Sequence, residues 1–216
     1  MTPFADRRSA GLELVAQLPQ WRGTDAVVLG IPRGGIVVAA AVAEGLGLRM
    51  DAIIVRKLGA SGHEEYAVGA IAEGVRVVTP AAMRWAGMSS RDLERVEAAE
   101  RDELARRTDA YGSRPEDLSG RTAIVVDDGV ATGATAVAAC RAVRAWDPER
   151  IVLAVPVAPE RWEPPADAVD TYVCPHREAD FWAVGQYYDD FRQTTDAEVL
   201  ALLRSASTGS TTPESR

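Results

Sequence analysis

Hydrophobic residues along the chain gather in short uncharged runs, separated by longer segments in which apolar and charged residues mix. The short runs are rich in Val, Ile and Leu and are bounded by polar residues or glycine, which predicts buried β-strands. The predicted strands occupy residues 25–31, 50–58, 67–79 (as two short strands around Glu73-Gly74), 123–126, 150–158 and 171–174.

Helical signals fill most of the segments between the predicted strands. Capping patterns and apolar spacing predict helices at 7–18, 36–47 and 89–111, after Thr135, and from Thr195-x-x-Glu198 onward. In the helix after Thr135, the spacing places four apolar residues on one face: Ala136, Ala139, Cys140 and Val143. The long helix 89–111 opens with Ser89-x-x-Asp92 as a capping box, and its alternating charges favour a solvated face with ion pairs.

Strands and helices alternate along the chain, and the inner strands are continuous apolar runs. This order predicts an α/β fold with a parallel twisted sheet and helices on both faces. Ligands in such sheets bind beyond the carboxyl ends of the strands. Three loops are expected at that edge, namely 31–35, 56–65 and 127–135.

The composition narrows the class of protein. The 216 residues are 47% hydrophobic and 26% charged, as in an ordinary soluble globular protein, and the formal net charge is -8. Such a charge disfavours nucleic acids and anionic membranes as partners. The chain shows no apolar run long enough for a membrane span and no secretory signal, and Cys140 and Cys174 suggest no disulfide framework. A cytoplasmic location is expected.

The segment DDGVATGAT at 127–135 carries the strongest chemical signal. Asp127 and Asp128 end a buried strand, and because an unpaired buried carboxylate is costly, both are expected to reach solvent or a polar ligand. The small residues that follow lead into a helix, whose free N–H groups favour a phosphate. Thr132 and Thr135 add hydroxyl donors. A ribose 5-phosphate fits both features, since its diol donates to carboxylates while its phosphate sits on the loop.

The stretch VVDDGVATGAT resembles the signature of the type I phosphoribosyltransferases, which bind phosphoribosyl pyrophosphate (PRPP). The resemblance implies that Asp127 and Asp128 hold the ribose hydroxyls. It also implies that the 5-phosphate lies on the loop formed by Ala131, Thr132, Gly133, Ala134 and Thr135. The alternative is an Asp-Asp helix cap followed by ordinary turn residues.

The segment IPRGG at 31–35 resembles the pyrophosphate-binding loop of the same family, which follows the first core strand and often contains an unusual peptide bond. Arg33, Gly34 and Gly35 occupy that place. The planar guanidinium of arginine suits pyrophosphate because it donates paired hydrogen bonds. The alternative is a tight strand-to-helix turn with an exposed arginine.

The segment VRKLGASGHEE is similar to the flexible catalytic loop of orotate phosphoribosyltransferases. Arg56 and Lys57 match its opening pair, and His63 lies one position from the family histidine. Ala60 replaces the second lysine, so orotate is not supported as a substrate. The resemblance implies a mobile loop at 59–65 with Arg56, Lys57 and His63 as catalytic residues, and an exposed loop histidine is the alternative for His63.

The segment FWAVGQYYDDFRQ at 181–193 resembles the C-terminal part of purine phosphoribosyltransferases. There an aromatic residue stacks on the base, and an aspartate four residues past a Val-Gly pair helps to hold magnesium. Trp182, Tyr187 or Tyr188 is the stacking candidate, and Asp189 is the metal ligand that this resemblance implies. The alternative is an amphipathic segment that closes the core.

The resemblance as a whole implies transfer of the 5-phosphoribosyl group from PRPP to a nucleobase-like acceptor with release of pyrophosphate. Mg²⁺ is then the expected cofactor, held largely by substrate oxygens. One domain is expected over 1–204, with a core at about 25–175, a small hood from the N-terminal segment and 176–204, and a disordered tail at 205–216. A homodimer is the default assembly.

Two other classes of protein share parts of this pattern. A regulator that binds PRPP or a nucleotide without catalysis keeps the ribose-phosphate loop, and the missing second lysine leaves that interpretation open. A phosphate-accepting receiver domain also has adjacent aspartates, but its acidic pair lies near the start of the chain. The identity of the acceptor is not encoded in any pattern that we recognise.

Overall fold

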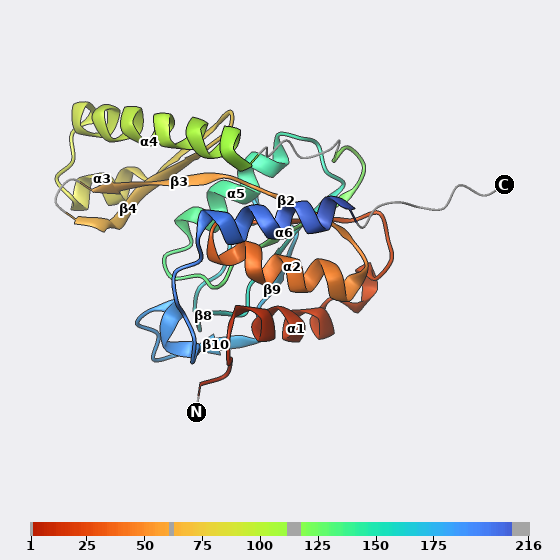
Figure 1. The fold of residues 1–216 in the computed structure, drawn as a ribbon. Helices are drawn as coiled ribbons and strands as arrows, with labels where there is room; N and C mark the ends of the chain where they lie inside the picture. Colours follow the sequence, from red (N-terminus) through yellow and green to blue (C-terminus); the bar gives the residue numbers. More distant parts are fainter. Residues whose placement is uncertain (1, 61–62, 112–117, 209–216) are drawn as a thin grey trace.

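The computed structural model describes residues 2–60, 63–111 and 118–208, with the side chains of 63–67 and 207–208 left aside (Figure 1). Its centre is a five-stranded sheet in the order β2-β1-β6-β7-β9, in which every neighbouring pair is parallel. The strands are β1 (Val27–Gly30), β2 (Arg49–Ala52), β6 (Thr122–Val126), β7 (Arg150–Ala154) and β9 (Thr171–Val173). The predicted fold class is confirmed.

Helices cover both faces of this sheet. One face carries α1 (Arg7–Gln17), α2 (Gly34–Leu46) and α6 (Asp196–Thr208), and the other carries α5 (Ala134–Arg144). Successive side chains of a strand point to opposite faces, so Ile124 lies in the core under α2 while Val125 lies in the core under α5. The strands therefore read as continuous apolar runs because both faces are buried.

A second, antiparallel sheet projects away from the first (Figure 1). It has the order β3-β4-β5, with β3 (Val55–Ala60), β4 (His63–Ala72) and β5 (Val75–Val78). The predicted single strand at 50–58 is therefore wrong, because β2 and β3 belong to different sheets. The predicted polar loop at 59–65 is also wrong for the described residues, since β3 and β4 pair as far as Ala60 and His63. Buried Leu58 and Ala60 anchor this hairpin in the core.

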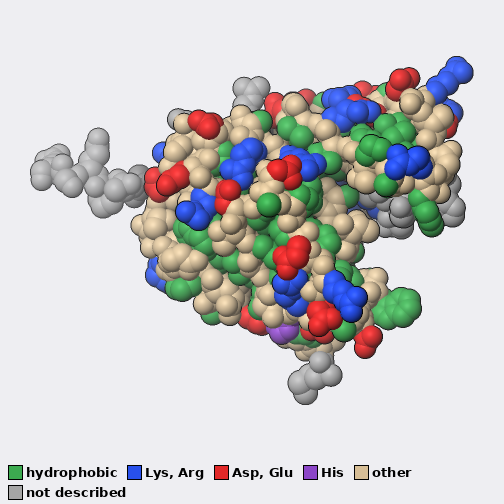
Figure 2. Space-filling model, turned by 180° about the vertical axis from the view of Figure 1, so that it is seen from behind, with side chains coloured by type: hydrophobic (Ala, Val, Ile, Leu, Met, Phe, Trp, Pro, Cys, Tyr) green, Lys and Arg blue, Asp and Glu red, His purple; other side chains and the backbone are tan. Residues whose placement is uncertain are grey.

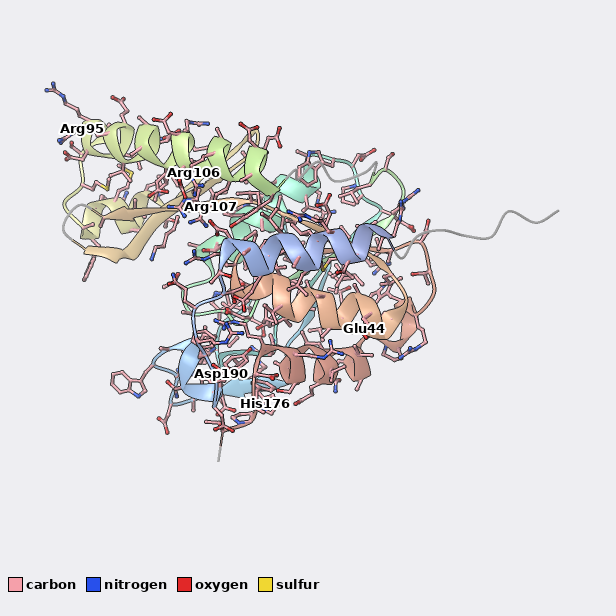
Figure 3. The ribbon with its side chains drawn as sticks, viewed as in Figure 1. Glu44, Arg95, Arg106, Arg107, His176 and Asp190 are labelled. Atoms are coloured by element: carbon pink, nitrogen blue, oxygen red, sulfur yellow. The ribbon has the colours of Figure 1, made fainter. Side chains whose placement is uncertain are left out.

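The helices α3 (Pro80–Trp85) and α4 (Ser90–Tyr111) follow β5, and α4 lies along the hairpin sheet. Ser89 and Asp92 form the predicted capping box, since each backbone N–H donates to the other side chain at 3.1 and 3.2 Å. Charged side chains of α4 pair within the helix, including those of Arg106 and Arg107, which both bond Glu103 (Figure 3). The predicted ion-paired face is confirmed.

An aromatic cluster closes one end of the molecule, and we define it as Phe4, Phe181, Tyr187, Tyr188 and Phe191. Two short strands flank it, β8 (Val157–Pro159) and β10 (His176–Glu178), and two 3₁₀ turns complete the chain, η1 (Pro19–Trp21) and η2 (Val184–Tyr187). His176, which is labelled in Figure 3, meets the Phe4 ring edge-on with 5.0 Å between the ring centres.

Three boundaries at this end differ from the sequence prediction. The strand expected at 150–158 divides into β7 and β8, because the chain leaves the central sheet after Ala154. The strand β9 is not the last, since β10 follows it. The helix α6, expected in the hood, packs instead against α2 and β2 and continues to Thr208. The rest of the expected tail, residues 209–216, lies outside the described residues.

The surface seen from behind carries acidic and basic side chains interspersed with one another (Figure 2). No helix among the described residues is both long and apolar enough to cross a membrane.

Candidate active site

Two of the three predicted loops meet at the carboxyl edge of the central sheet. The strands β1 and β6 are parallel neighbours, so the loop after β1 and the loop after β6 emerge side by side. A Cβ atom on Gly34 would overlap the Asp128 carboxylate, and one on Gly35 would lie 2.9 Å from Cα of Asp127. Glycine at both positions therefore allows the start of α2 to approach the acidic pair. The bond between Pro32 and Arg33 is cis, which is the unusual peptide bond that the resemblance implies.

The two carboxylates are half-buried at the end of β6. Burial raises the pKa of Asp127 well above its usual value, and the neighbouring charge of Asp128 raises it further. The backbone N–H of Asp128 donates to Asp127 Oδ1 at 2.9 Å, which opposes part of this rise. Burial also raises the pKa of Asp128. Hydroxyl groups that donate to the ionised carboxylates would offset the cost of holding two charges here.

Arg7, which no sequence motif identifies, contacts this acidic pair. Its Nε lies 2.8 Å from Asp128 Oδ2, and the side chains of the two residues are 10% and 17% exposed. Nη1 of Arg7 donates to the backbone oxygen of Arg192 at 2.8 Å, and the guanidinium carbon lies 3.9 Å from the centre of the Phe191 ring. The charge of Arg7 opposes the rise that burial causes in the pKa of Asp128.

The predicted phosphate loop leads directly into α5. Ala131 and Thr132 are exposed, Ala134 and Thr135 begin the helix, and Gly133 is its N-cap with φ 81°. No side chain caps this helix among the residues described, so its first N–H groups keep their capacity to bind an anion. These N–H groups are available to an anion, and the role of the loop toward a 5-phosphate stays a prediction.

Trp162 forms one wall of the phosphate loop, a role that the sequence analysis missed. A Cβ atom on Gly133 would lie within 2.5 Å of the Trp162 indole ring. Tyr172 meets the indole edge-on with 5.4 Å between ring centres, and Arg177 donates to the Trp162 backbone oxygen at 2.9 Å. The only signal in the sequence is a tryptophan within the proline-containing segment 156–165.

Arg33 lies at the start of α2, but its guanidinium is directed to another group. Its Nη1 is 3.6 Å from Asp196 Oδ1, and the Tyr111 hydroxyl donates to the same oxygen at 2.6 Å. Burial and the Asp196 carboxylate raise the pKa of Tyr111 to about 12. Arg33, which belongs to the predicted pyrophosphate loop, thus connects the start of α2 with the end of α4 and the start of α6. Its role toward pyrophosphate stays a prediction.

The predicted catalytic residues of the third loop lie in the hairpin. Arg56 is on β3, where its Nε bonds Glu100 Oε2 of α4 at 2.6 Å. Lys57 is the next residue of the strand and is half-buried. Neighbouring side chains on a strand point to opposite faces, so Arg56 and Lys57 are not presented together. His63 begins β4, and its side chain lies outside the described part of the structure.

Of the residues predicted in the C-terminal segment, Trp182 and Asp189 lie on the surface, and Tyr187 and Tyr188 are buried. Trp182 is 90% exposed, and the exposed Asp189 accepts a hydrogen bond from the Thr2 hydroxyl. Among the described residues, no three His, Cys, Asp or Glu side chains gather into a metal site. Tyr188 is the residue of this segment that reaches the acidic pair, because its hydroxyl donates to the Asp128 backbone oxygen at 2.6 Å.

Comparison with known proteins agrees with this geometry. The family model for the phosphoribosyl transferase domain matches residues 10–192, so the chain belongs to this family. The protein named "Putative phosphoribosyl transferase" in two strains of Mycobacterium tuberculosis is 44% identical over 210 residues, which are 94% of this chain. The chain spans 47% of those relatives, about half their length.

A solved structure has the same fold. The crystal structure of TT1426 from Thermus thermophilus matches with a TM-score of 0.73 and 43% sequence identity, and the match covers 94% of this chain and 98% of that one. The family predicted from VVDDGVATGAT is therefore confirmed.

Proposed function

We propose that this chain transfers the 5-phosphoribosyl group from PRPP to a nucleobase-like nucleophile and releases pyrophosphate. The observation that supports it best is the contact between two glycines and two carboxylates, Gly34 with Asp128 and Gly35 with Asp127. This contact brings residues 31–35 and 127–135 together at one edge of the sheet, which supports their proposed roles as pyrophosphate loop and ribose-phosphate loop. PRPP carries pyrophosphate at C1 and phosphate at C5, with a diol between them, and therefore matches the order of these groups.

In this mechanism Asp127 and Asp128 accept hydrogen bonds from the ribose hydroxyls, and the N-terminus of α5 binds the 5-phosphate. Negative charge develops on the departing pyrophosphate while positive charge develops on the ribose ring. The paired carboxylates favour the cationic ring, and backbone groups at the start of α2 face the departing anion. Mg²⁺, as the expected cofactor, would supply further positive charge to the pyrophosphate.

The residues for magnesium are few on the protein side. Asp189 is an exposed carboxylate at the surface, and one protein carboxylate suits a Mg²⁺ ion that is held mainly by substrate oxygens and water. We keep Asp189 as the proposed protein ligand. PRPP and a small-molecule acceptor are the proposed partners, and nucleic acid and membrane are not among them. We also propose a homodimer and a cytoplasmic location.

A second function, binding of PRPP without catalysis, is favoured by the hairpin. Arg56 is engaged by Glu100, and Ala60 stands where related catalytic loops have a second lysine. A regulator of this kind would keep the acidic pair and the phosphate loop intact. Release of pyrophosphate on incubation with PRPP, Mg²⁺ and a panel of purine and pyrimidine bases separates the two functions, because a regulator binds PRPP and releases none.

The central experiment measures PRPP·Mg²⁺ binding by calorimetry for wild type and Asp127→Asn/Asp128→Asn. Each hydrogen bond to a charged acceptor contributes roughly 1.5 to 3 kcal/mol, so we expect affinity to fall by about 100-fold or more. The control is Asp102→Asn/Asp109→Asn, which removes the same number of charges from α4. Equal affinity in wild type and in the Asp127/Asp128 variant, with both folded, would exclude the proposal.

A further inference from the structure

Arg7 lies outside every motif that we identified in the sequence, yet it links three parts of the molecule. It begins α1, bonds the signature residue Asp128, and donates to the backbone of Arg192 beyond the aromatic cluster. The ring of Phe191 stacks against its guanidinium. These contacts fix the side chain from several directions, and only 10% of it is exposed. An arginine held in this way has little freedom to follow a carboxylate that moves.

The position of the contact on Asp128 is specific. Arg7 Nε bonds Oδ2, and we expect a ligand hydroxyl to approach the carboxylate at its other oxygen, Oδ1. Gly34 lies against both groups, because a Cβ atom there would be 2.7 Å from Arg7 Nε and would overlap Asp128 Oδ2. The start of α2 therefore leaves a space that this ion pair fills.

We propose that Arg7 is a positioning residue for Asp128. Arg7 holds the Asp128 carboxylate in its charged form and in one orientation for the ribose hydroxyls of PRPP. This inference rests on the proposed function for its ligand, and on the ion pair for its physics. Arginine suits the role because its planar guanidinium bonds the carboxylate and stacks on an aromatic ring at the same time. Through Arg192 and Phe191, the same side chain couples the aromatic cluster to the ribose site.

The groups that face Asp128 come from several elements. Arg7 of α1 favours the charged carboxylate, and the neighbouring carboxylate of Asp127 disfavours it. Tyr188 donates its hydroxyl to the backbone oxygen of Asp128, and α2 presents Gly34, which has no side chain. Burial raises the pKa of Asp128, and among these groups Arg7 carries the opposing positive charge. Its removal is therefore expected to raise that pKa further.

The test compares Arg7→Gln and Arg7→Lys with Arg8→Gln. Arg8 is the next residue of α1, and its Nη1 forms a surface ion pair with Glu44 of α2 at 2.8 Å, which makes it a control on the same helix. First, carbon-13 NMR of the aspartate carboxyls follows the titration of Asp128 without any ligand, with the signal assigned from Asp128→Asn. Second, calorimetry gives the affinity for PRPP·Mg²⁺ at two pH values, one at the Asp128 midpoint that NMR gives for wild type and one about two pH units above it, where the carboxylate is ionised.

For Arg7→Gln we expect the Asp128 titration midpoint at higher pH. We also expect a loss of PRPP affinity of roughly 10- to 100-fold, the range for removal of an orienting partner, and a larger loss at the lower of the two pH values than at the higher one. Arg7→Lys keeps the charge and should give an intermediate midpoint, which also serves if Arg7→Gln does not fold. Arg8→Gln should match wild type in both measurements.

Two outcomes would overturn the inference. One is an unchanged Asp128 midpoint in folded Arg7→Gln or in Arg7→Lys. The other is a loss of affinity that is the same at both pH values, which indicates structural support alone. If wild type itself does not bind PRPP, the proposed function fails, and the ligand-free titration still decides whether Arg7 holds Asp128 charged.

Discussion

The phosphate loop at 127–135 and the hairpin β3–β4 both carry residues that resemble a phosphoribosyltransferase, but they are built differently. The loop is fixed by short-range geometry, because a buried parallel strand ends, the chain turns, and α5 begins within a few residues. The hairpin is fixed by pairing with β5 and by contacts with α4, which lies far along the chain. Motif residues in the loop therefore keep their expected places, and those in the hairpin do not.

The largest expected effect follows from Gly133→Ala in the phosphate loop. The new methyl group would meet the Trp162 indole, and φ of 81° disfavours any side chain. Backbone strain and overpacking together cost about 2 to 5 kcal/mol, which urea unfolding measures. Gly120→Ala is the control, because Gly120 has φ of 70° with nothing within 4 Å, and it should cost only about 1 to 2 kcal/mol.

The double variant Gly133→Ala/Trp162→Ala separates the two causes. Removal of the indole makes room for the methyl group, so Gly133→Ala should cost less stability in a Trp162→Ala background than in wild type, and the remaining cost is that of backbone strain. Full wild-type stability in Gly133→Ala would show that the loop accommodates a side chain against Trp162, and short-range geometry would then not fix it as described.

The next effect concerns pH. Burial raises the pKa of both Asp127 and Asp128, and the ribose hydroxyls are expected to bind the ionised forms. Affinity for PRPP should therefore be constant above these pKa values and fall as pH drops through them. The fall should begin at higher pH than for an exposed aspartate, whose pKa is about 3.9. At pH values near or below these pKa values, binding of PRPP should release protons from the aspartates. Calorimetry in buffers of different ionisation enthalpy measures this release.

The ligand's own phosphates also titrate, so the same experiment on Asp127→Asn serves as the comparison. Asp127→Asn removes one of the two carboxyl groups whose pKa is raised. The affinity for PRPP should therefore decrease less steeply at low pH in this variant than in wild type. An affinity for PRPP that falls with the same steepness in both proteins would mean that the phosphates, rather than the acidic pair, set the pH dependence.

A smaller effect is expected in the hairpin, where Arg56 bonds Glu100. A double-mutant cycle with Arg56→Gln and Glu100→Gln should give a coupling of about 1 kcal/mol in urea unfolding, as for a half-buried ion pair. Pyrophosphate release with PRPP and an acceptor base gives the second readout. If Arg56 acts in catalysis, Arg56→Gln will reduce the rate far more than Glu100→Gln, whereas a purely structural pair predicts similar rates for both.

The smallest effect is expected for Trp182→Ala. The side chain is 90% exposed, so stability in urea should change by less than about 0.5 kcal/mol. A base that stacks on Trp182 would make KM for the acceptor rise while affinity for PRPP stays constant. An unchanged KM for the acceptor would mean that Trp182 does not stack on the base.

The sequence predicted the parts of the site that depend on local order. The acidic pair, the small-residue loop and the glycines at the start of α2 were all placed from neighbours in the chain, and the structure brings these two loops together. Arg7 and Trp162 were missed because each meets its partner across a long stretch of sequence. No pattern of nearby residues marks such a contact.

The sequence by itself determined the α/β class and the family, because strand periodicity and the loop between β6 and α5 are local properties. The tertiary structure alone decided that residues 50–58 enter two different sheets, that Arg56 pairs with α4, and that Arg7 reaches Asp128. Each of these depends on which buried surfaces pack together. Packing is selected by the free energy of the whole fold rather than by any single segment.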